Sequence, residues 1–270
     1  MNRRSRIAQV LAMNFPDNQI WIIGGTSESV MVAQAIAEKN FSCIVTVTTA
    51  DAVKLYPALP NLRIRVGQLK EFEIYQFIQQ EKIVAIVDAS HPYAISISET
   101  VIQIAQVLQT PYLRYERAAL VPSQNITVLE NFETLLTGNY LTNKRVLLTV
   151  GYKILPRFKI WQNQAVLFSR ILPSLESLKV ALESGFTSDR LIAIRPPISI
   201  DLEKALWQQW NISLVVSKAS GQAGGEEIKQ RVAELLGIPL MIIARPKVDY
   251  PQQTNDLNEV LNFCYHYCLN

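Results

Sequence analysis

Histidine and cysteine are scarce in this sequence, and their scarcity excludes several kinds of protein. Only two histidines and three cysteines occur among 270 residues, and Cys43, Cys264 and Cys268 form an odd number without framework spacing. A disulfide-stapled domain is therefore excluded, and free thiols in a reducing compartment are expected. His266 falls on a different helical face from Cys264 and Cys268, so we predict terminal-helix packing there and no metal site.

Long apolar runs and concentrated basic charge are also missing. No run reaches the ~18 apolar residues of a membrane span. The basic first segment precedes an apolar stretch that Gln9 and Asn14 interrupt, and it lacks the small-residue cleavage site of a signal peptide. The net charge of +3 and the lack of a Lys/Arg run beyond the first six residues argue against nucleic-acid binding. We expect a cytoplasmic protein that binds neither membrane nor nucleic acid.

Apolar residues make up 49% of the chain and charged residues 18%, which supports a sizeable buried core. Short, nearly continuous apolar runs alternate with helical stretches, as is typical of parallel strands covered on both faces. The predicted fold class is α/β, with two Rossmann-like doubly wound domains and mainly parallel sheets. The expected strands are 20–23, 44–48, 62–66, 83–87, 112–115, 146–150, 165–169, 191–194, 212–216 and 240–244, and the expected helices include 27–39, 94–109, 174–184, 201–209 and 225–236.

Ten apolar runs are many for one sheet and suit two sheets of about five strands. The join is expected within 116–145, which holds a turn at 122–125 and a weak strand at 126–129. We predict an N-terminal dinucleotide-binding domain over 1–125 and a C-terminal domain over 126–270. Whether the final helix packs on the first domain is left open.

The first candidate site is the turn Gly24-Gly25-Thr26-Ser27-Glu28, which follows the first expected strand and opens a helix. Paired glycines let the backbone approach a pyrophosphate, and the helix N-terminus supplies unpaired N–H groups and partial positive charge. The turn is not the full G-x-G-x-x-G fingerprint. Phosphate binding and a purely structural turn therefore both stay open.

The end of the second expected strand bears on cofactor choice. Thr48 and Thr49 stand where an acidic residue usually reads the ribose 2′-hydroxyl and repels a 2′-phosphate. The absence of that acid favours NADPH over NADH. The alternative is a hydroxyl-rich loop that touches no cofactor.

The second candidate site is the segment Asp88-Ala89-Ser90-His91-Pro92-Tyr93-Ala94, at the end of an apolar strand. Ligands of doubly wound sheets bind at such strand ends. His91 can donate a hydrogen bond to cofactor or substrate, and Tyr93 can stack or donate. The alternative is that Asp88 or Ser90 caps a helix begun by Pro92, with His91 merely packed.

Basic residues form the remaining candidates. Arg114 lies in the fifth expected strand and Arg117 follows it, and both suit a carboxylate or phosphate ligand, although an ion pair between Glu116 and an arginine is an alternative. In the second half, Lys153 follows the strand 146–150. The loop after 212–216 offers a lysine, hydroxyls and glycines that suit an anion, with a flexible surface loop as the alternative. Its candidate residues are Lys218, Ser220 and Gly221, and Arg245 ends the strand 240–244.

Taken in order, these segments resemble the precorrin-6A reductase family of corrin biosynthesis, including its cobalt-precorrin-6A relatives. The segments that carry the resemblance are GGTSE, DASHPYA, PYLRYER, LLTVGYK, SKASGQAGG and IIARP, and they span residues 20–246. The resemblance implies reduction of one double bond of the precorrin-6A macrocycle, or of its cobalt form, by hydride from NADPH, with NADH as the alternative cofactor.

The resemblance also implies a tetrapyrrole substrate in the interdomain cleft of a monomer or small homo-oligomer. The expected catalytic residues are His91, Tyr93 and Lys218. The expected cofactor-binding residues are Gly24, Gly25, Thr26, Ser27, Glu28, Thr48, Thr49, Asp88 and Ser90. The expected substrate-binding residues are Arg114, Arg117, Lys153, Ser220, Gly221 and Arg245.

Two other functions are alternatives to a precorrin-6A reductase. A short-chain reductase of small carbonyl compounds would carry a Tyr-x-x-x-Lys pair on a helix, and no expected helix carries one. A non-catalytic nucleotide- or tetrapyrrole-binding α/β protein would show binding without turnover, and it stays open.

Overall fold

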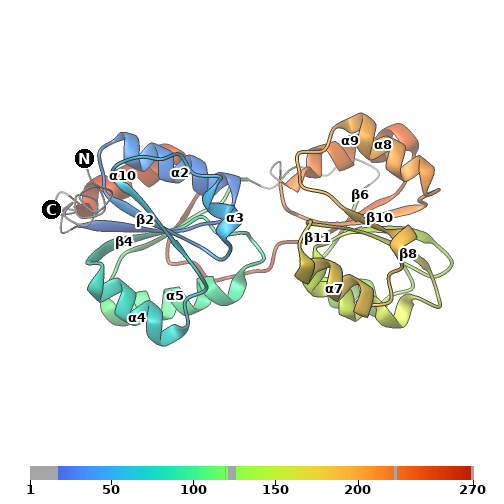
Figure 1. Cartoon of the computed structure of the whole chain (residues 1–270), viewed down its shortest axis with the longest axis horizontal. Coiled ribbons are helices and arrows are strands. Elements are labelled where there is room, and N and C mark those ends of the chain that lie inside the picture. Colours follow the sequence, from blue (N-terminus) through green and yellow to red (C-terminus); the bar gives the residue numbers. More distant parts are fainter. Residues whose placement is uncertain (1–17, 119, 121–125, 222–223, 269–270) are drawn as a thin grey trace, which may run out of the picture. The chain divides into compact units, whose positions relative to one another are not determined.

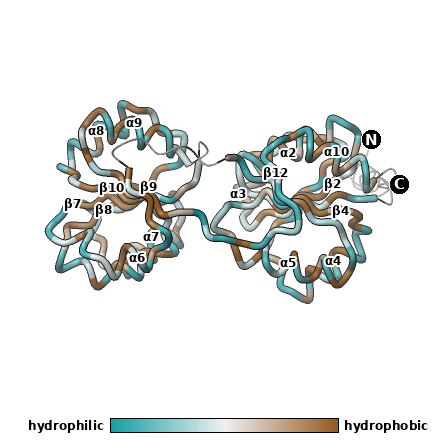
Figure 2. The backbone as a smooth tube through the Cα atoms, turned by 180° about the vertical axis from the view of Figure 1, so that it is seen from behind, coloured by the Kyte–Doolittle hydropathy of each residue, from teal (hydrophilic) through white to brown (hydrophobic). Residues whose placement is uncertain are grey.

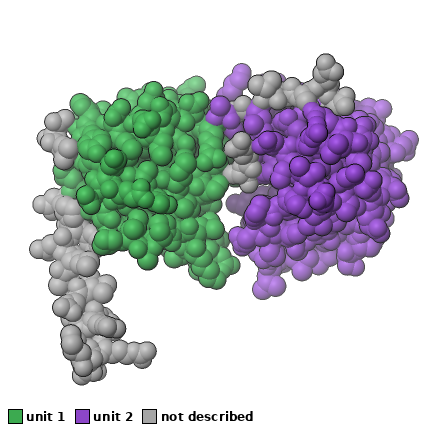
Figure 3. All heavy atoms as spheres, turned by 90° about the horizontal axis from the view of Figure 1, so that it is seen from above, with its two compact units in different colours: residues 1–117, 248–270 green, residues 118–247 purple. Residues whose placement is uncertain are grey.

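The computed structural model describes residues 18–118, 120, 126–221 and 224–268. The chain divides into two compact units: residues 1–117 together with 248–270, called unit 1, and residues 118–247, called unit 2 (Figure 3). Each unit contains one six-stranded sheet with helices on both faces (Figure 1). The predicted fold class, α/β with doubly wound, mainly parallel sheets, is confirmed.

The sheet of unit 1 has the strand order β12-β5-β4-β1-β2-β3, and all its neighbouring strands pair in parallel. The chain runs outward from the centre in both directions, so the order reverses between β1 and β4. This strand pair is the topological switch point of unit 1. The strands are β1 (Gln19–Ile23), β2 (Cys43–Val47), β3 (Leu62–Val66), β4 (Ile83–Asp88), β5 (Tyr112–Tyr115) and β12 (Gln253–Thr254).

Alternate residues of β1 pack against opposite helix layers of unit 1. Ile20 and Ile22 lie in a buried cluster with residues of α2 and α10, whereas Trp21 and Ile23 lie in a second cluster with residues of α4 and α5. Figure 2 shows the resulting hydrophobic centre of the sheet and the hydrophilic outer turns. The helices of unit 1 are α2 (Ser27–Glu38), α3 (Ala50–Val53), α4 (Glu71–Gln80), α5 (Ile95–Leu108) and α10 (Leu257–Cys268).

Unit 2 repeats this plan with the order β6-β11-β10-β7-β8-β9, again all parallel. Its switch point lies between β7 and β10. The strands are β6 (Ile126–Leu129), β7 (Arg145–Thr149), β8 (Val166–Ile171), β9 (Leu191–Ala193), β10 (Leu214–Lys218) and β11 (Leu240–Ile243). The helices are α6 (Phe132–Thr137), the 3-10 segments η1 (Tyr152–Trp161) and η2 (Ser188–Arg190), α7 (Leu175–Glu183), α8 (Ile200–Gln209) and α9 (Glu226–Leu236).

The chain passes between the units twice, and each passage supplies an edge strand. After β5 of unit 1 the chain enters unit 2, where β6 pairs with β11. After β11 it returns to unit 1, where β12 pairs with β5. The sheet of unit 1 therefore has five strands from the first part of the chain and a sixth, β12, from its C-terminal part, whereas all six strands of unit 2 come from one continuous segment.

This return corrects the expected C-terminal domain of 126–270. Residues 248–270 belong to unit 1, whereas the expected boundary at 125 lies close to the observed one at 117. The C-terminal segment returns to unit 1 because α10 has an apolar face. Its residues Val260, Phe263 and Cys264 are buried in the core of unit 1. The open alternative, a final helix that packs on the first domain, is the observed one.

The three cysteines are free thiols. Burial raises the pKa of the Cys43 thiol to about 12 and also raises the pKa of Cys264. Such thiols are poor metal ligands because the metal-binding thiolate is suppressed. Among the described residues, no helix has the length and apolar composition needed to cross a membrane.

We predict that Phe263→Ala lowers the free energy of unfolding by about 3 kcal/mol, because the phenyl ring fills the core between α10 and the sheet. Glu259→Ala, on the exposed side of the same helix, is the control and should change it by less than about 0.5 kcal/mol. Urea unfolding followed by circular dichroism measures both. Equal effects of the two variants would contradict the packing of α10 on unit 1.

Candidate active site

The glycine turn after β1 combines a tight packing position with an open one. A Cβ on Gly24 would lie 2.5 Å from the Tyr56 hydroxyl and from a Val45 methyl, so only glycine fits there. Gly25 has φ +102°, and a Cβ on it would meet no atom within 4 Å. The backbone at Gly25 therefore faces open space at the switch point, as a bound pyrophosphate requires.

Tyr56 hydrogen-bonds to this turn, and the sequence motifs did not predict a role for it. Its hydroxyl accepts the Gly25 N–H at 2.9 Å and lies 2.6 Å from the Ser29 hydroxyl. Burial raises the pKa of Tyr56, so the hydroxyl stays protonated. Tyr56 sits in the connection between β2 and β3, where no motif marks it.

Thr26 joins the two strands of the switch point. Its hydroxyl accepts the Ser29 N–H at 3.0 Å and caps α2, and it donates to the carbonyl of Ala89, beyond β4, at 2.8 Å. The first turn of α2, which begins at Ser27 and Glu28, therefore opens on the same edge as the loop after β4. Helix N-termini leave N–H groups unpaired, and these suit a phosphate.

Thr48 and Thr49 are exposed at the end of β2. The carboxyl ends of parallel strands share one edge of the sheet, so both hydroxyls lie on the edge that carries the glycine turn. Thr49 precedes α3 without a side-chain capping bond, which keeps its hydroxyl out of the helix-capping role. The structure thus brings both threonines to the expected cofactor edge.

Asp88 does not present its carboxylate to a ligand, and this corrects its expected role as a cofactor-binding residue. It is 0% exposed. One oxygen accepts from the Ser90 N–H and from Arg114 Nη1, both at 2.9 Å. The other accepts from the Ser98 and Tyr112 hydroxyls, both at 2.6 Å. Asp88 therefore holds the loop after β4 from beneath.

Arg114 is likewise internal, which corrects its expected role in substrate binding. It is 1% exposed and pairs with Asp88 at 2.9 Å and with Glu116 at 2.7 Å. Burial by itself would lower the pKa of Arg114. The negative charges of Asp88 and Glu116 have the larger, opposite effect, so the pKa of Arg114 is raised. The alternative of an ordinary ion pair with Glu116 is the observed one, and it is buried.

His91 and Tyr93 stand above this buried network, at the carboxyl edge of the sheet. His91 is exposed, and its Nδ1 accepts the Tyr93 N–H at 3.2 Å, while the two ring centroids lie 5.8 Å apart. Ser90 is buried, and its hydroxyl accepts from Arg114. The alternative in which Pro92 begins the helix is not observed, because α5 begins at Ile95, close to the expected start at 94.

Arg117 lies apart from Arg114, against the first turns of α2. Its guanidinium is 4.0 Å from the Glu28 carboxylate and contacts the Met31 sulfur at 3.5 Å. Its side chain is 39% exposed. Arg117 therefore lies in the surroundings of the glycine turn, and its expected role in substrate binding stays a prediction.

Unit 2 gathers cations at its own switch point. Lys218 ends β10, and a Cβ on Gly151, which follows β7, would lie 3.9 Å from the Lys218 ammonium. This ammonium also lies 5.7 Å from the ring centroid of Phe132. Burial, with a smaller effect of Lys153, lowers the pKa of Lys218 to about 8. Lys153 is exposed.

The described residues of the loop after β10 form internal hydrogen bonds, and the expected substrate-binding role of Gly221 stays a prediction. Gly221 is buried, and its N–H donates to the Glu226 carboxylate at 2.7 Å. That N–H therefore serves an internal anion. Arg245 donates from Nε to the Ala219 carbonyl at 2.9 Å, and Ser220 is half-buried in the same loop.

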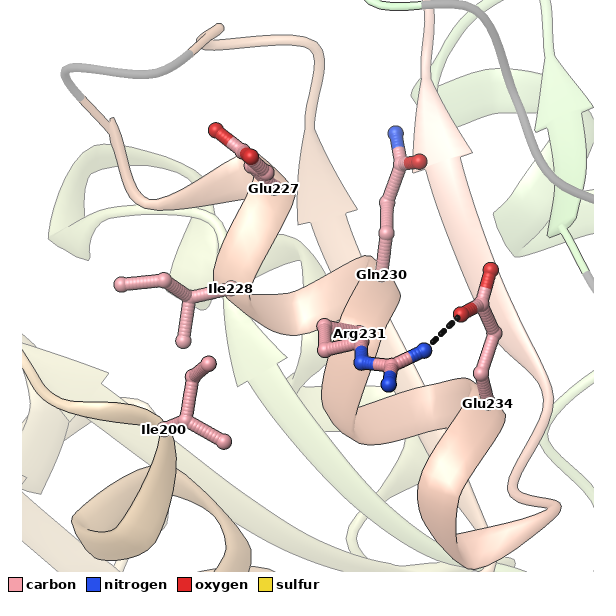
Figure 4. Close-up of a pocket in the computed structure, with 6 residues that line it drawn as sticks. All are labelled: Ile200, Glu227, Ile228, Gln230, Arg231 and Glu234. Carbon is pink, nitrogen blue, oxygen red and sulfur yellow. Dashed lines mark hydrogen bonds and ion pairs between the residues drawn. The ribbon is translucent and has the colours of Figure 1, made fainter.

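A groove of about 520 Å³ lies on α8 and α9 of unit 2, and none of its lining residues is a candidate site residue (Figure 4). Its lining comes from the start of α8 and from α9, where Arg231 pairs with Glu234. Ligands of doubly wound domains bind at the carboxyl ends of the strands and not on outer helices. The candidate site is therefore placed at the strand ends. The groove is lined by Ile200, Glu227, Ile228, Gln230, Arg231 and Glu234.

Two doubly wound domains, a glycine turn opening a helix and a cation-lined strand edge are the features of a Rossmann-like α/β protein. Residues 19–265 match the model of the family described as precorrin-6x reductase CbiJ/CobK. The chain belongs to this family and is an enzyme of it. A reductase of this kind implies a reduced nicotinamide cofactor.

Individual relatives agree with the family match. A cobalt-precorrin-6A reductase of Synechocystis sp. is 48% identical over 248 residues, which cover 91% of this chain and 95% of the relative. A precorrin-6A reductase of Mycobacterium tuberculosis is 27% identical over 229 residues, covering 84% and 89%. The solved structure of a CobK precorrin-6A reductase shares the fold, with a TM-score of 0.76, 21% identity and coverage of 93% and 97%.

We predict that Tyr56→Phe weakens NADPH binding about fivefold, because the Gly25 N–H and the Ser29 hydroxyl lose their common partner and the turn is no longer fixed. Tyr75→Phe, which removes a hydroxyl on the partly exposed α4, is the matched control and should leave binding unchanged. Fluorescence titration with NADPH measures both. Unchanged or tighter binding by Tyr56→Phe would show that the hydroxyl does not position the turn.

Proposed function

We propose that this chain reduces one double bond of cobalt-precorrin-6A to the corresponding precorrin-6B form, with NADPH as the cofactor. The 48% identity with a cobalt-precorrin-6A reductase over nearly the whole chain carries the proposal and favours the cobalt form of the substrate. The three free cysteines agree with a cytoplasmic location, which is proposed with it.

NADPH fits the carboxyl edge of unit 1. The open backbone at Gly25 and the N-terminus of α2 suit its pyrophosphate. Thr48 and Thr49 replace the acidic residue that would repel a 2′-phosphate, and the exposed guanidinium of Arg117 adds positive charge beside α2. When bound, the nicotinamide supplies the hydride.

The carboxylates of the tetrapyrrole fit the carboxyl edge of unit 2. Lys153, Lys218 and Arg245 end or follow three of its strands, and the Ser220 hydroxyl lies in the same loop as Lys218. Cations at this edge bind and orient an anionic macrocycle without attacking it, as reduction requires. In unit 1, His91 and Tyr93 lie at the carboxyl edge of the sheet, where they would orient substrate or nicotinamide.

Lys218 is proposed as the proton donor. Reduction of a carbon–carbon double bond adds a hydride to one carbon and a proton to the other. With a pKa of about 8, the Lys218 ammonium is protonated at neutral pH yet gives up its proton more readily than an ordinary lysine. The neutral amine left behind regains a proton from water.

The function is tested by anaerobic assay of the purified protein with cobalt-precorrin-6A and with precorrin-6A, each with NADPH and with NADH. We expect oxidation of NADPH at 340 nm to be fastest with cobalt-precorrin-6A. Binding of both ligands without oxidation of either nucleotide would show a non-catalytic binding protein and refute the proposal.

The pH profile tests the role of Lys218. The acid form of its side chain is the active one, so kcat should fall as the pH rises through about 8. Lys153→Gln removes a neighbouring positive charge that lowers this pKa, and it should move the fall in kcat to higher pH. Lys218→Met should lower kcat by about 100-fold. An unchanged profile in Lys218→Met would assign the proton to another donor.

A further inference from the structure

Helix α9 carries two buried charged residues that the proposed reaction does not use. Glu226 is 3% exposed and Lys229 is 2% exposed, and both belong to the first turns of the helix. Charged side chains are rarely buried so completely without a specific partner. The partners of both lie in the loop between β10 and α9.

Glu226 forms a reciprocal pair with Gly221. Its carboxylate accepts the Gly221 N–H at 2.7 Å, and its own N–H donates to the Gly221 carbonyl at 3.2 Å. Gly221 has φ +66°, a left-handed conformation that favours glycine. The side chain at the helix start therefore fixes the backbone three residues beyond Lys218.

Lys229 holds the other end of the loop. Its ammonium donates to the Gly224 carbonyl at 2.6 Å. A Cβ on Gly224 would lie 1.8 Å from the Ser220 hydroxyl oxygen, so Ser220 packs directly on Gly224. The position of Gly224 therefore determines where the Ser220 side chain lies.

The two buried charges are balanced by a second pair behind them. Arg170 of β8 forms an ion pair with Glu203 of α8, and Glu203 also accepts from Trp207 Nε1 at 3.0 Å. Burial and Arg170 lower the pKa of Lys229 to about 8, while Glu203 and Glu226 act in the opposite direction. Positive and negative groups from β8, α8 and α9 thus face one another in the interior of unit 2.

We infer that Glu226 and Lys229 are positioning residues that fix Ser220, Gly221 and Gly224, which follow Lys218, in the geometry that binds the substrate's carboxylates. The inference rests on the proposed function. Neither residue touches the substrate: each acts through a backbone hydrogen bond at one end of the loop.

The experiment compares Glu226→Gln, Glu226→Ala and Lys229→Met with Glu227→Gln, a change at the exposed neighbouring residue. Each variant is assayed for the KM of cobalt-precorrin-6A, for kcat and for the Kd of NADPH. Glu226→Ala and Lys229→Met should raise KM at least tenfold and leave the Kd of NADPH within twofold of the wild type. Glu226→Gln keeps an oxygen acceptor for the Gly221 N–H and should be affected less than Glu226→Ala.

A second variant moves the loop without touching the buried charges. Gly224→Ala places a Cβ against the Ser220 hydroxyl and should raise the same KM with NADPH binding unchanged. Wild-type KM values in Glu226→Ala, Lys229→Met and Gly224→Ala would overturn the inference, as would equal losses of NADPH and macrocycle binding. Absence of turnover in the wild type would instead refute the proposed function.

Discussion

Parallel strands can be joined only by crossover connections, and in both units these connections leave the central strand pair on opposite faces of the sheet. β1 continues into α2 and β4 into α5, and these two helices lie in different layers (Figure 1). The loops therefore diverge above the switch point and leave backbone open there, as at Gly25. The same reversal between β7 and β10 brings Gly151 and Lys218 together. One topological constraint thus determines where both candidate binding edges lie.

Buried charge serves the same purpose in each unit, although the residues differ. In unit 1 the Asp88–Arg114 pair lies beneath the loop that carries His91, and it holds Ser90 through both backbone and side chain. In unit 2 the charged residues of α9 hold the loop that follows Lys218. In both units, buried charged groups thus define the backbone that carries the polar groups at the strand ends.

The apolar runs sufficed to predict the fold class and nearly all the strands, because continuous burial leaves a strong signal. β12 escaped prediction because two residues carry no periodicity, and its place depends on pairing with β5. The sequence motifs predicted which loops carry polar residues, but they did not predict which of those side chains are buried. Arg114 and Lys218 look alike in sequence as basic residues at strand ends, yet Arg114 is fully paired inside the protein. Tyr56 acts through a contact 31 residues distant, which no local pattern records.

The return of the chain to unit 1, where β12 completes the sheet, has a consequence for synthesis of the chain. The five strands of unit 2 and its sixth, β6, have all been made once β11 leaves the ribosome. Unit 1, although translated first, lacks β12 and the packing of α10 until the final residues emerge. N-terminal domains usually fold first during translation. Here the sheet of unit 1 is begun first but is completed only after the sheet of unit 2.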